Sequence, residues 1–165
     1  IIKLASSPSL IAASVNCLSS LHMLPFLKYF FSCDPIRIIE LSNSQLPEHS
    51  SVVCPSFYRH LFHDPGLLHP SYECIVDTQF SISRHSCSIP FLQSFVYSLC
   101  FLYSLGHRNI LVAGIEGYSR PSHNTELLLS LAVLQQNLPD LNLLSLHSNS
   151  LGIPSVSPYE LLGSL

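Results

Sequence analysis

Short apolar runs alternate along the chain with longer segments in which apolar residues recur at helical spacing. The short runs predict strands at 1–5, 36–41, 51–54, 73–77, 109–115 and 141–146. The longer segments predict helices near 9–31, 56–62, 90–105 and 124–137, with a last one at 158–164. Because uninterrupted apolar strands are typical of a sheet that is covered on both faces, this order predicts an α/β fold.

A Rossmann-like architecture is the form of α/β fold that this alternation favours. We expect a mostly parallel sheet of five to six strands with helices on both faces, joined by right-handed crossovers. The second half carries the clearest signals: Pro90 suits a first helical turn, Gly106 a helix end and Asn124 an N-cap. With 165 residues the chain fits one domain, 1–165, and is too short for a (β/α)8 barrel of about 250 residues.

Charge and hydropathy exclude two classes of partner. Seven basic and ten acidic residues give a net charge of −3, and no basic stripe is present, so we expect no nucleic-acid partner. The longest apolar run, "FLQSFVYSLCFLYSL" at 91–105, contains a glutamine and serines and ends at Gly106. It is shorter than the roughly 20 apolar residues of a membrane span, so it predicts a buried helix.

The cysteines and the first residues bear on location and completeness. The six cysteines are scattered, form no C-x-x-C pair and lie mostly in apolar runs, which favours a reduced, cytoplasmic protein. The chain begins "IIKLASSPSL", directly in strand-like sequence and without an initiator Met. We therefore expect a C-terminal fragment of a longer chain.

Polar segments follow three of the predicted strands, where ligands bind in open parallel sheets. The first is the turn "ASSPSL", with Ser6, Ser7 and Ser9; an ordinary serine-rich helix start is the alternative. The last is "SLHSNSLGIP", in which Ser148, Asn149 and Ser150 offer neutral donors and acceptors or form only a polar loop. Both segments predict ligand contacts at the same edge of the sheet.

The segment "GIEGYSR" is the most distinctive of the three. Gly114 and Gly117 free the backbone at the strand exit, Glu116 can accept hydrogen bonds from sugar hydroxyls, and Tyr118 can stack on a ring. A tight turn with a solvated acid is the alternative. His123 lies at the start of the following helix, where it can act as a general acid or base or simply belong to a surface loop.

The remaining histidines do not predict a metal centre. His60, His63 and His69 lie close together in "RHLFHDPGLLH", but no cysteine or glutamate at matching spacing completes a set of three or four ligands. The sequence therefore predicts no metal site and leaves open whether these three side chains converge. The chain also lacks a G-x-S-x-G elbow, a P-loop and a G-x-G-x-x-G motif.

Two quoted stretches resemble a known family. "IPFLQSFVYSLCFLYSLGHRNILVAGIEGYSRPSHNTE" and "LNLLSLHSNSLGIPSVSPYELL" resemble the C-terminal, Rossmann-like domain of bacterial aldolase-type proteins of surface-polysaccharide synthesis, in the HMG-CoA lyase and 4-hydroxy-2-oxovalerate aldolase group. Gly114, Gly117, Tyr118 and Glu126 fit that family's spacing. The match is good over 88–162. The resemblance implies an auxiliary domain of a lyase whose catalytic barrel, with any divalent metal, lies elsewhere in the parent; the fragment itself would need no cofactor.

A more distant resemblance is to bacterial sialyltransferases that use CMP-sialic acid. The shared features are the P-S-L loop, the long helix, a G-I-acid-x-Y strand exit and an N-S after the last strand. This resemblance implies that those segments surround a CMP group and that His123 serves as the base.

Three hypotheses follow from the sequence. The first is an auxiliary domain that binds a nucleotide, nucleotide sugar or anionic sugar at Ser6–Ser9, Glu116–Tyr118 and Ser148–Ser150. The second is a glycosyltransferase that uses a CMP-activated sugar, with His123 as base. The third is a structural or homo-oligomerising domain whose ancestral site has decayed, which the serines in place of first-turn glycines favour.

Overall fold

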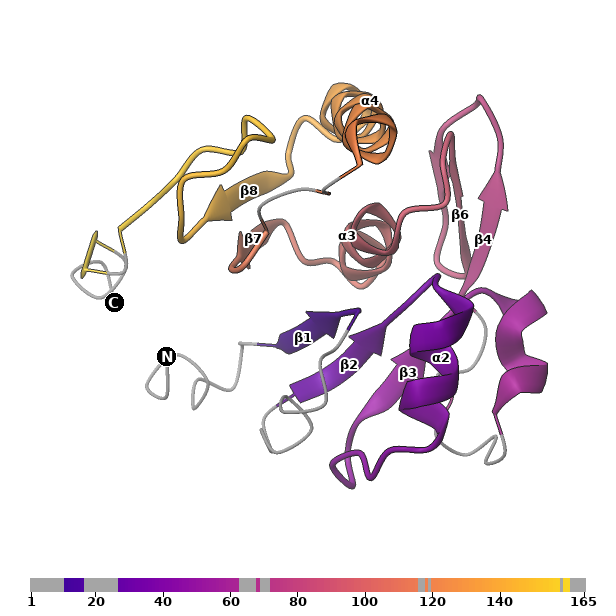
Figure 1. Cartoon of the computed structure of the whole chain (residues 1–165). Helices are drawn as coiled ribbons and strands as arrows, with labels where there is room; N and C mark the ends of the chain where they lie inside the picture. Colours follow the sequence, from indigo (N-terminus) through magenta and orange to yellow (C-terminus); the bar gives the residue numbers. More distant parts are fainter. Residues whose placement is uncertain are drawn as a thin grey trace.

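The computed structural model describes residues 11–16, 27–62, 68, 72–115, 118, 120–157 and 159–160. Within these ranges the chain forms three small sheets with helices packed between and beside them (Figure 1). The sheets have strand orders β1-β2-β3, β4-β6-β5 and β7-β8. The expected single sheet of five to six mostly parallel strands is therefore wrong, although helices and strands do alternate.

The first sheet consists of three parallel strands, β1 (Ala12–Val15), β2 (Leu27–Phe31) and β3 (Ser51–Val53). Neighbouring residues of β2 point to opposite faces. Phe31 packs in the larger core with helix α3 (Ser94–Ser104), whereas Phe30 packs in a smaller core with helix α2 (Pro35–Ser42). This sheet is thus covered on both faces, as its uninterrupted apolar strands require.

Helix α2 occupies the stretch 36–41, which the sequence analysis interprets as a strand. Asp34 caps the helix by accepting a hydrogen bond from the Ile36 amide, and Pro35 lies in the first turn. Ile38 and Leu41 are buried, three residues apart, as a helix face requires. The strand prediction is wrong because the capping signal outweighs the strand propensity of the isoleucines. The expected helix at 9–31 is also wrong, since β1 and β2 lie within it.

The second sheet is mixed. β4 (Glu73–Val76) pairs in parallel with β6 (Ser86–Ile89), and β5 (Ser81–Ile82) joins β6 on the other side in antiparallel orientation. A short 3₁₀ helix, η2 (Ser56–Leu61), precedes it. A short turn joins β5 and β6, so their pairing is local in the sequence. None of the three strands of this sheet pairs with a described strand of another sheet.

Helix α3 lies at the centre of the molecule and helps to form the larger core. Its residues 94–101 are all buried, which is typical of a helix surrounded by other elements. The ring of Phe101 contacts Tyr29, Phe31 and Tyr72 at centroid distances of 5.1–5.3 Å. Gly106, at φ +95°, follows the helix end, as predicted.

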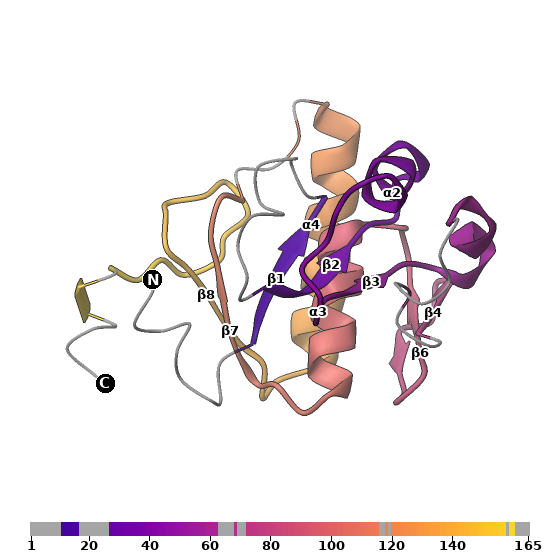
Figure 2. The same cartoon turned by 90° about the horizontal axis from the view of Figure 1, so that it is seen from below.

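The last unit comprises β7 (Asn109–Val112), α4 (Pro121–Asn137) and β8 (Asn142–Ser145). β7 and β8 are parallel and pair only with each other among the described strands. In both views β7 lies beside β1 (Figures 1 and 2), yet no described ladder of hydrogen bonds joins them. This missing pairing is one of the reasons why the expected continuous sheet does not form.

Candidate functional site

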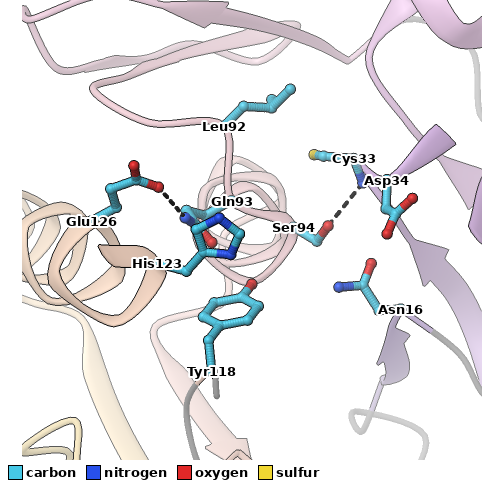
Figure 3. A pocket seen from close by; sticks show the side chains of 9 residues that line it. All are labelled: Asn16, Cys33, Asp34, Leu92, Gln93, Ser94, Tyr118, His123 and Glu126. Atoms are coloured by element: carbon cyan, nitrogen blue, oxygen red, sulfur yellow. Dashed lines mark hydrogen bonds between the residues drawn. The ribbon is translucent and has the colours of Figure 1, made fainter. Parts of the chain in front are cut away.

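A pocket of about 220 Å³ opens at the carboxyl ends of β1 and β2. Because the two strands are parallel, the segments that follow them meet at one edge of their sheet, where ligands commonly bind. The first residues of α3 and α4 close the other sides (Figure 3). The lining residues are Asn16, Cys33, Asp34, Leu92, Gln93, Ser94, Tyr118, His123 and Glu126.

Asn16 and Asp34 line the pocket on the strand side. Asn16 follows β1 with φ at 49°, a left-handed conformation that asparagine tolerates better than most residues. Its Oδ1 accepts a hydrogen bond from the Ser32 hydroxyl at 3.0 Å, while its Nδ2 donates to no described residue. Asp34 uses Oδ1 to cap α2, at 2.9 Å from the Ile36 nitrogen, and its second carboxylate oxygen has no described partner.

Gln93 and Ser94 form the floor of the pocket, at the beginning of α3. The Ser94 hydroxyl accepts a hydrogen bond from the buried Cys33 amide at 2.8 Å, which joins the helix to the end of β2. Burial raises the pKa of the Cys33 thiol well above its ordinary value, so the thiol stays protonated at neutral pH. Gln93 is only 6% exposed; its Nε2 donates to Glu126 at 3.3 Å, and its Oε1 accepts from no described residue.

Tyr118, His123 and Glu126 line the side formed by α4. The Asn124 side chain fixes Tyr118 by accepting from its backbone amide and donating to its carbonyl oxygen at 2.6 Å. Burial raises the pKa of the Tyr118 phenol, which therefore keeps its proton and can donate it in a hydrogen bond. The imidazole of His123 meets the Tyr118 ring edge to face at 5.6 Å and forms no hydrogen bond with a described residue.

The charge of the pocket is negative. Asp34 and Glu126 are its two carboxylates and lie on opposite sides of the start of α3 (Figure 3), while no lysine or arginine is among the lining residues. Among the described residues no group of three histidine, cysteine or acidic side chains is placed to hold a metal ion. The arrangement offers hydrogen-bond acceptors and neutral donors, with one imidazole.

Of the predicted site residues, Tyr118 and His123 lie in this pocket. Gly114 lies two residues after β7 at φ +72°, the left-handed conformation that favours glycine, but it does not line the pocket. Ser6, Ser7, Ser9, Glu116 and Gly117 lie outside the described residues, as do His63 and His69.

Ser148, Asn149 and Ser150, which the sequence analysis predicts to contact a ligand, do not line this pocket. Asn149 instead holds its own loop together: its Oδ1 accepts from the amides of Leu151 and Ile153, and its Nδ2 donates to the Ile153 carbonyl at 2.9 Å. These contacts occupy the side chain that was expected to bind a ligand.

Sequence reasoning misses most of this site. Asn16, Gln93 and Ser94 stand in segments that were interpreted as helices, Asp34 stands between a predicted helix and a predicted strand, and Glu126 was noted only as a first-turn acid and a family match. The sequence "CDP" at 33–35 is the signal that could have found Asp34, because an acid before a proline is typical of a helix start. Asn124 does not cap α4, which begins at Pro121, but holds Tyr118.

No described helix is both long and apolar enough to cross a membrane. No family model, curated protein or solved structure matches the chain.

Proposed function

We propose that this chain is a small-molecule-binding domain and that its ligand is a nucleotide sugar or a related sugar. One observation carries the proposal: polar side chains from four separate segments converge on one pocket at the carboxyl ends of two parallel strands. One segment follows β1, one follows β2, and the other two lie at the beginnings of α3 and α4. Such convergence is typical of a ligand site in an α/β protein.

The chemistry of the lining supports a ligand rich in hydroxyl groups. Asp34 and Glu126 each have a carboxylate oxygen without a described partner, and Asn16 has an unused amide donor. Hydrogen bonds to charged groups contribute about 1.5–3 kcal/mol each, roughly twice the contribution of neutral ones. Sugar hydroxyls can satisfy both kinds of group at once, since each hydroxyl donates and accepts.

The test is equilibrium binding by ligand-detected NMR and calorimetry with a panel of monosaccharides, nucleosides and nucleotide sugars. We expect at least one member to bind and Tyr118→Phe to weaken it several-fold, because the phenol is a fixed donor inside the pocket. Tyr159→Phe is the matched control, since Tyr159 is 85% exposed and does not line the pocket. A panel that gives no binding at millimolar concentration contradicts the proposal and favours a structural domain.

A glycosyltransferase that uses a CMP-activated sugar is the second candidate. The observation that favours it is the position of His123, whose imidazole lines the pocket without a described hydrogen-bond partner and is therefore available to accept a proton. On this hypothesis His123→Ala abolishes transfer and leaves nucleotide binding nearly intact. Binding of CMP without turnover of any CMP-sugar, in the chain and in any longer parent protein, contradicts it.

The aldolase-type parent protein, the homo-oligomer and the cytoplasmic location remain parts of the same proposal. The five described cysteines are unpaired, which suits a reducing compartment. The relation to the lyase family is tested by reading the coding sequence upstream of Ile1 for a segment of about 250 residues, the size of a barrel.

A further inference from the structure

The proposed function leaves open which part of a nucleotide sugar enters the pocket, and the charge of the lining bears on this choice. A phosphate or a sugar carboxylate in the pocket would lie between Asp34 and Glu126, with no lining lysine or arginine to compensate. Sites for anions are commonly built from basic side chains or from backbone amides at helix N-termini. The first turns of α3 and α4 have no side-chain cap, but Asp34 and Glu126 place two negative charges beside them. Asp34 moreover occupies the cap of α2, so the amide of Ile36 there is already satisfied.

The unused hydrogen-bond capacity of the pocket is largely that of acceptors. Gln93 is 6% exposed, and its Oε1 accepts no hydrogen bond from a described residue. Because Gln93 lines the pocket, a ligand donor can reach this oxygen and form a hydrogen bond with it. Together with the free oxygens of Asp34 and Glu126, Gln93 presents three acceptors from three different elements.

The volume limits the size of the group. About 220 Å³ lies below the ~300–1,000 Å³ of sites that enclose a drug-sized ligand. This space suits one ribose or hexose ring better than a complete nucleotide.

We propose that the pocket binds a single uncharged sugar ring through hydroxyl donors that point to Asp34, Gln93 and Glu126, and that it excludes anionic groups. The proposal rests on the proposed function and narrows it: the nucleotide's phosphates, or the carboxylate of an acidic sugar, stay outside the pocket. The ring is either a glycosyl unit or the ribose of a nucleoside, because both present the same hydroxyl chemistry.

The experiment compares neutral probes with their anionic counterparts on the full chain. Methyl β-glucoside is paired with methyl β-glucuronide, and cytidine is paired with CMP. We expect the glucoside to bind at least ten-fold more tightly than the glucuronide if the ring is a glycosyl unit. If the ring is ribose, cytidine binds at least as tightly as CMP. The pair that binds identifies the source of the ring.

Two conservative variants make the test specific. Glu126→Gln removes the charge and keeps an acceptor, and Asp34→Asn does the same while preserving a good N-cap for α2. Each should weaken the neutral probe about ten-fold, because a charged acceptor is lost, and should leave unchanged or strengthen the anionic probe. A folding defect would weaken both probes alike, so the opposite signs separate recognition from damage. Glu48→Gln, an exposed carboxylate outside the pocket, changes the net charge equally and should alter neither affinity.

The outcomes distinguish this inference from the function on which it rests. Tighter binding of the glucuronide or of CMP than of its neutral counterpart, weakened by Tyr118→Phe, overturns the inference and keeps the binding function. Neutral probes that bind with equal affinity to the wild type and to both carboxylate variants also overturn it. If neither pair binds, and no other member of the sugar and nucleotide panel does, the proposed function itself is overturned.

Discussion

At the scale of single residues, Asn124 shows how one side chain can shape the pocket without lining it. Its amide group accepts from the backbone nitrogen of Tyr118 and donates to the carbonyl oxygen of the same residue. The backbone of Tyr118 is thereby fixed, and its ring is directed into the pocket (Figure 3).

We expect Asn124→Ala to lower the free energy of unfolding by about 1–2 kcal/mol, since two hydrogen bonds of about 1 kcal/mol each are lost. It should also weaken any pocket ligand, because Tyr118 is no longer held. Urea unfolding measures the first effect. Thr125→Ala is the matched control: Thr125 is exposed, and its hydroxyl donates only to the Pro121 carbonyl of its own helix. Equal losses in the two variants would contradict the assigned role.

Burial limits the reactivity of the cysteines that the structure describes. All five described cysteines are buried: Cys33, Cys54, Cys74, Cys87 and Cys100. Burial raises the pKa of the Cys54 thiol to about 11, and the reactive thiolate is therefore scarce at neutral pH.

In a Cys17→Ser variant, we expect a disulfide reagent such as Ellman's reagent to modify no thiol of the native protein at pH 8 until the chain unfolds. Addition of denaturant should then expose five reactive groups. The kinetics of colour release in native and denaturing buffer provide the measurement. Rapid modification of any thiol in native buffer would show that its environment is more open than the structure indicates.

At the scale of elements, a hydrogen bond between the end of β2 and the start of α3 connects two sides of the pocket. The Ser94 hydroxyl accepts a hydrogen bond from the Cys33 amide, 61 positions away in the sequence, and both residues are buried. Because the Cys33 amide is buried, loss of the hydroxyl leaves this amide without the partner that it has in the native structure.

Ser94→Ala should destabilise the protein by about 1–3 kcal/mol, the cost of such an unsatisfied group. Ser98→Ala on the same helix provides the comparison, since its equally buried hydroxyl donates at 2.7 Å to the Phe95 carbonyl of its own helix. That carbonyl lies within the helix and can keep a backbone partner, so the loss should be smaller. Chemical denaturation measures the loss of stability in both variants. A larger loss in Ser98→Ala than in Ser94→Ala would contradict the role given to the hydrogen bond between Cys33 and Ser94.

A second set of contacts links the end of α3 to the turn that precedes β8. Asp140 accepts from the Tyr103 hydroxyl and from Arg108 Nε, each at 2.7 Å, and Arg108 lies 3.6 Å from the Tyr103 ring centroid. The Tyr103 hydrogen bond, followed by Arg108, lowers the pKa of Asp140 from its ordinary value of 3.8.

A carboxylate with a lowered pKa in the folded state contributes stability above its unfolded pKa and loses that contribution as the pH falls through the folded value. We therefore expect Asp140→Asn to be less stable than the wild type at pH 7, and the difference to shrink below pH 3.8. Tyr103→Phe, which keeps the ring beneath Arg108, should show a smaller difference with the same pH dependence. A difference that does not vary with pH would mean that packing, not charge, is responsible.

At the scale of the whole molecule, sequence patterns predict elements better than their assembly. The strands expected at 51–54, 73–77, 109–115 and 141–146 are confirmed within a few residues, as are helices over most of 90–105 and 124–137. The pairing of strands is not encoded in any short window, since it depends on backbone contacts between distant segments. The three sheets of the described residues, with β7 beside β1 but joined to it by no described ladder of hydrogen bonds, could not be predicted from apolar runs.

The same distinction explains what was found of the pocket. Tyr118 and His123 follow a recognisable strand exit, whereas Asn16 and Asp34 become site residues only because β1 and β2 are neighbours. Asp34 also has a sufficient local explanation as the cap of α2. A residue with a complete local role gives no signal of a second one in the sequence.

The core around α3 and α4 predicts where substitutions lower the free energy of unfolding most. Leu131→Ala should cost about 2–5 kcal/mol, because Leu131 is 3% exposed and its removal leaves a cavity. Leu128→Ala, one turn earlier on the same helix, should cost much less, since Leu128 is 42% exposed. Thermal unfolding of the two variants provides the measurement, and similar losses would contradict this packing.

The pocket is the place where the two halves of the chain share a wall. Asn16 and Asp34 come from the first sheet, whereas Gln93, His123 and Glu126 come from helices of the second half. A molecule that occupies the pocket would connect the two halves through non-covalent contacts. By linkage, a ligand at 100 times its Kd would raise the free energy of unfolding by about 2.7 kcal/mol. Amides in β2 and in α4 should then exchange with deuterium more slowly and together, although those elements are remote in sequence.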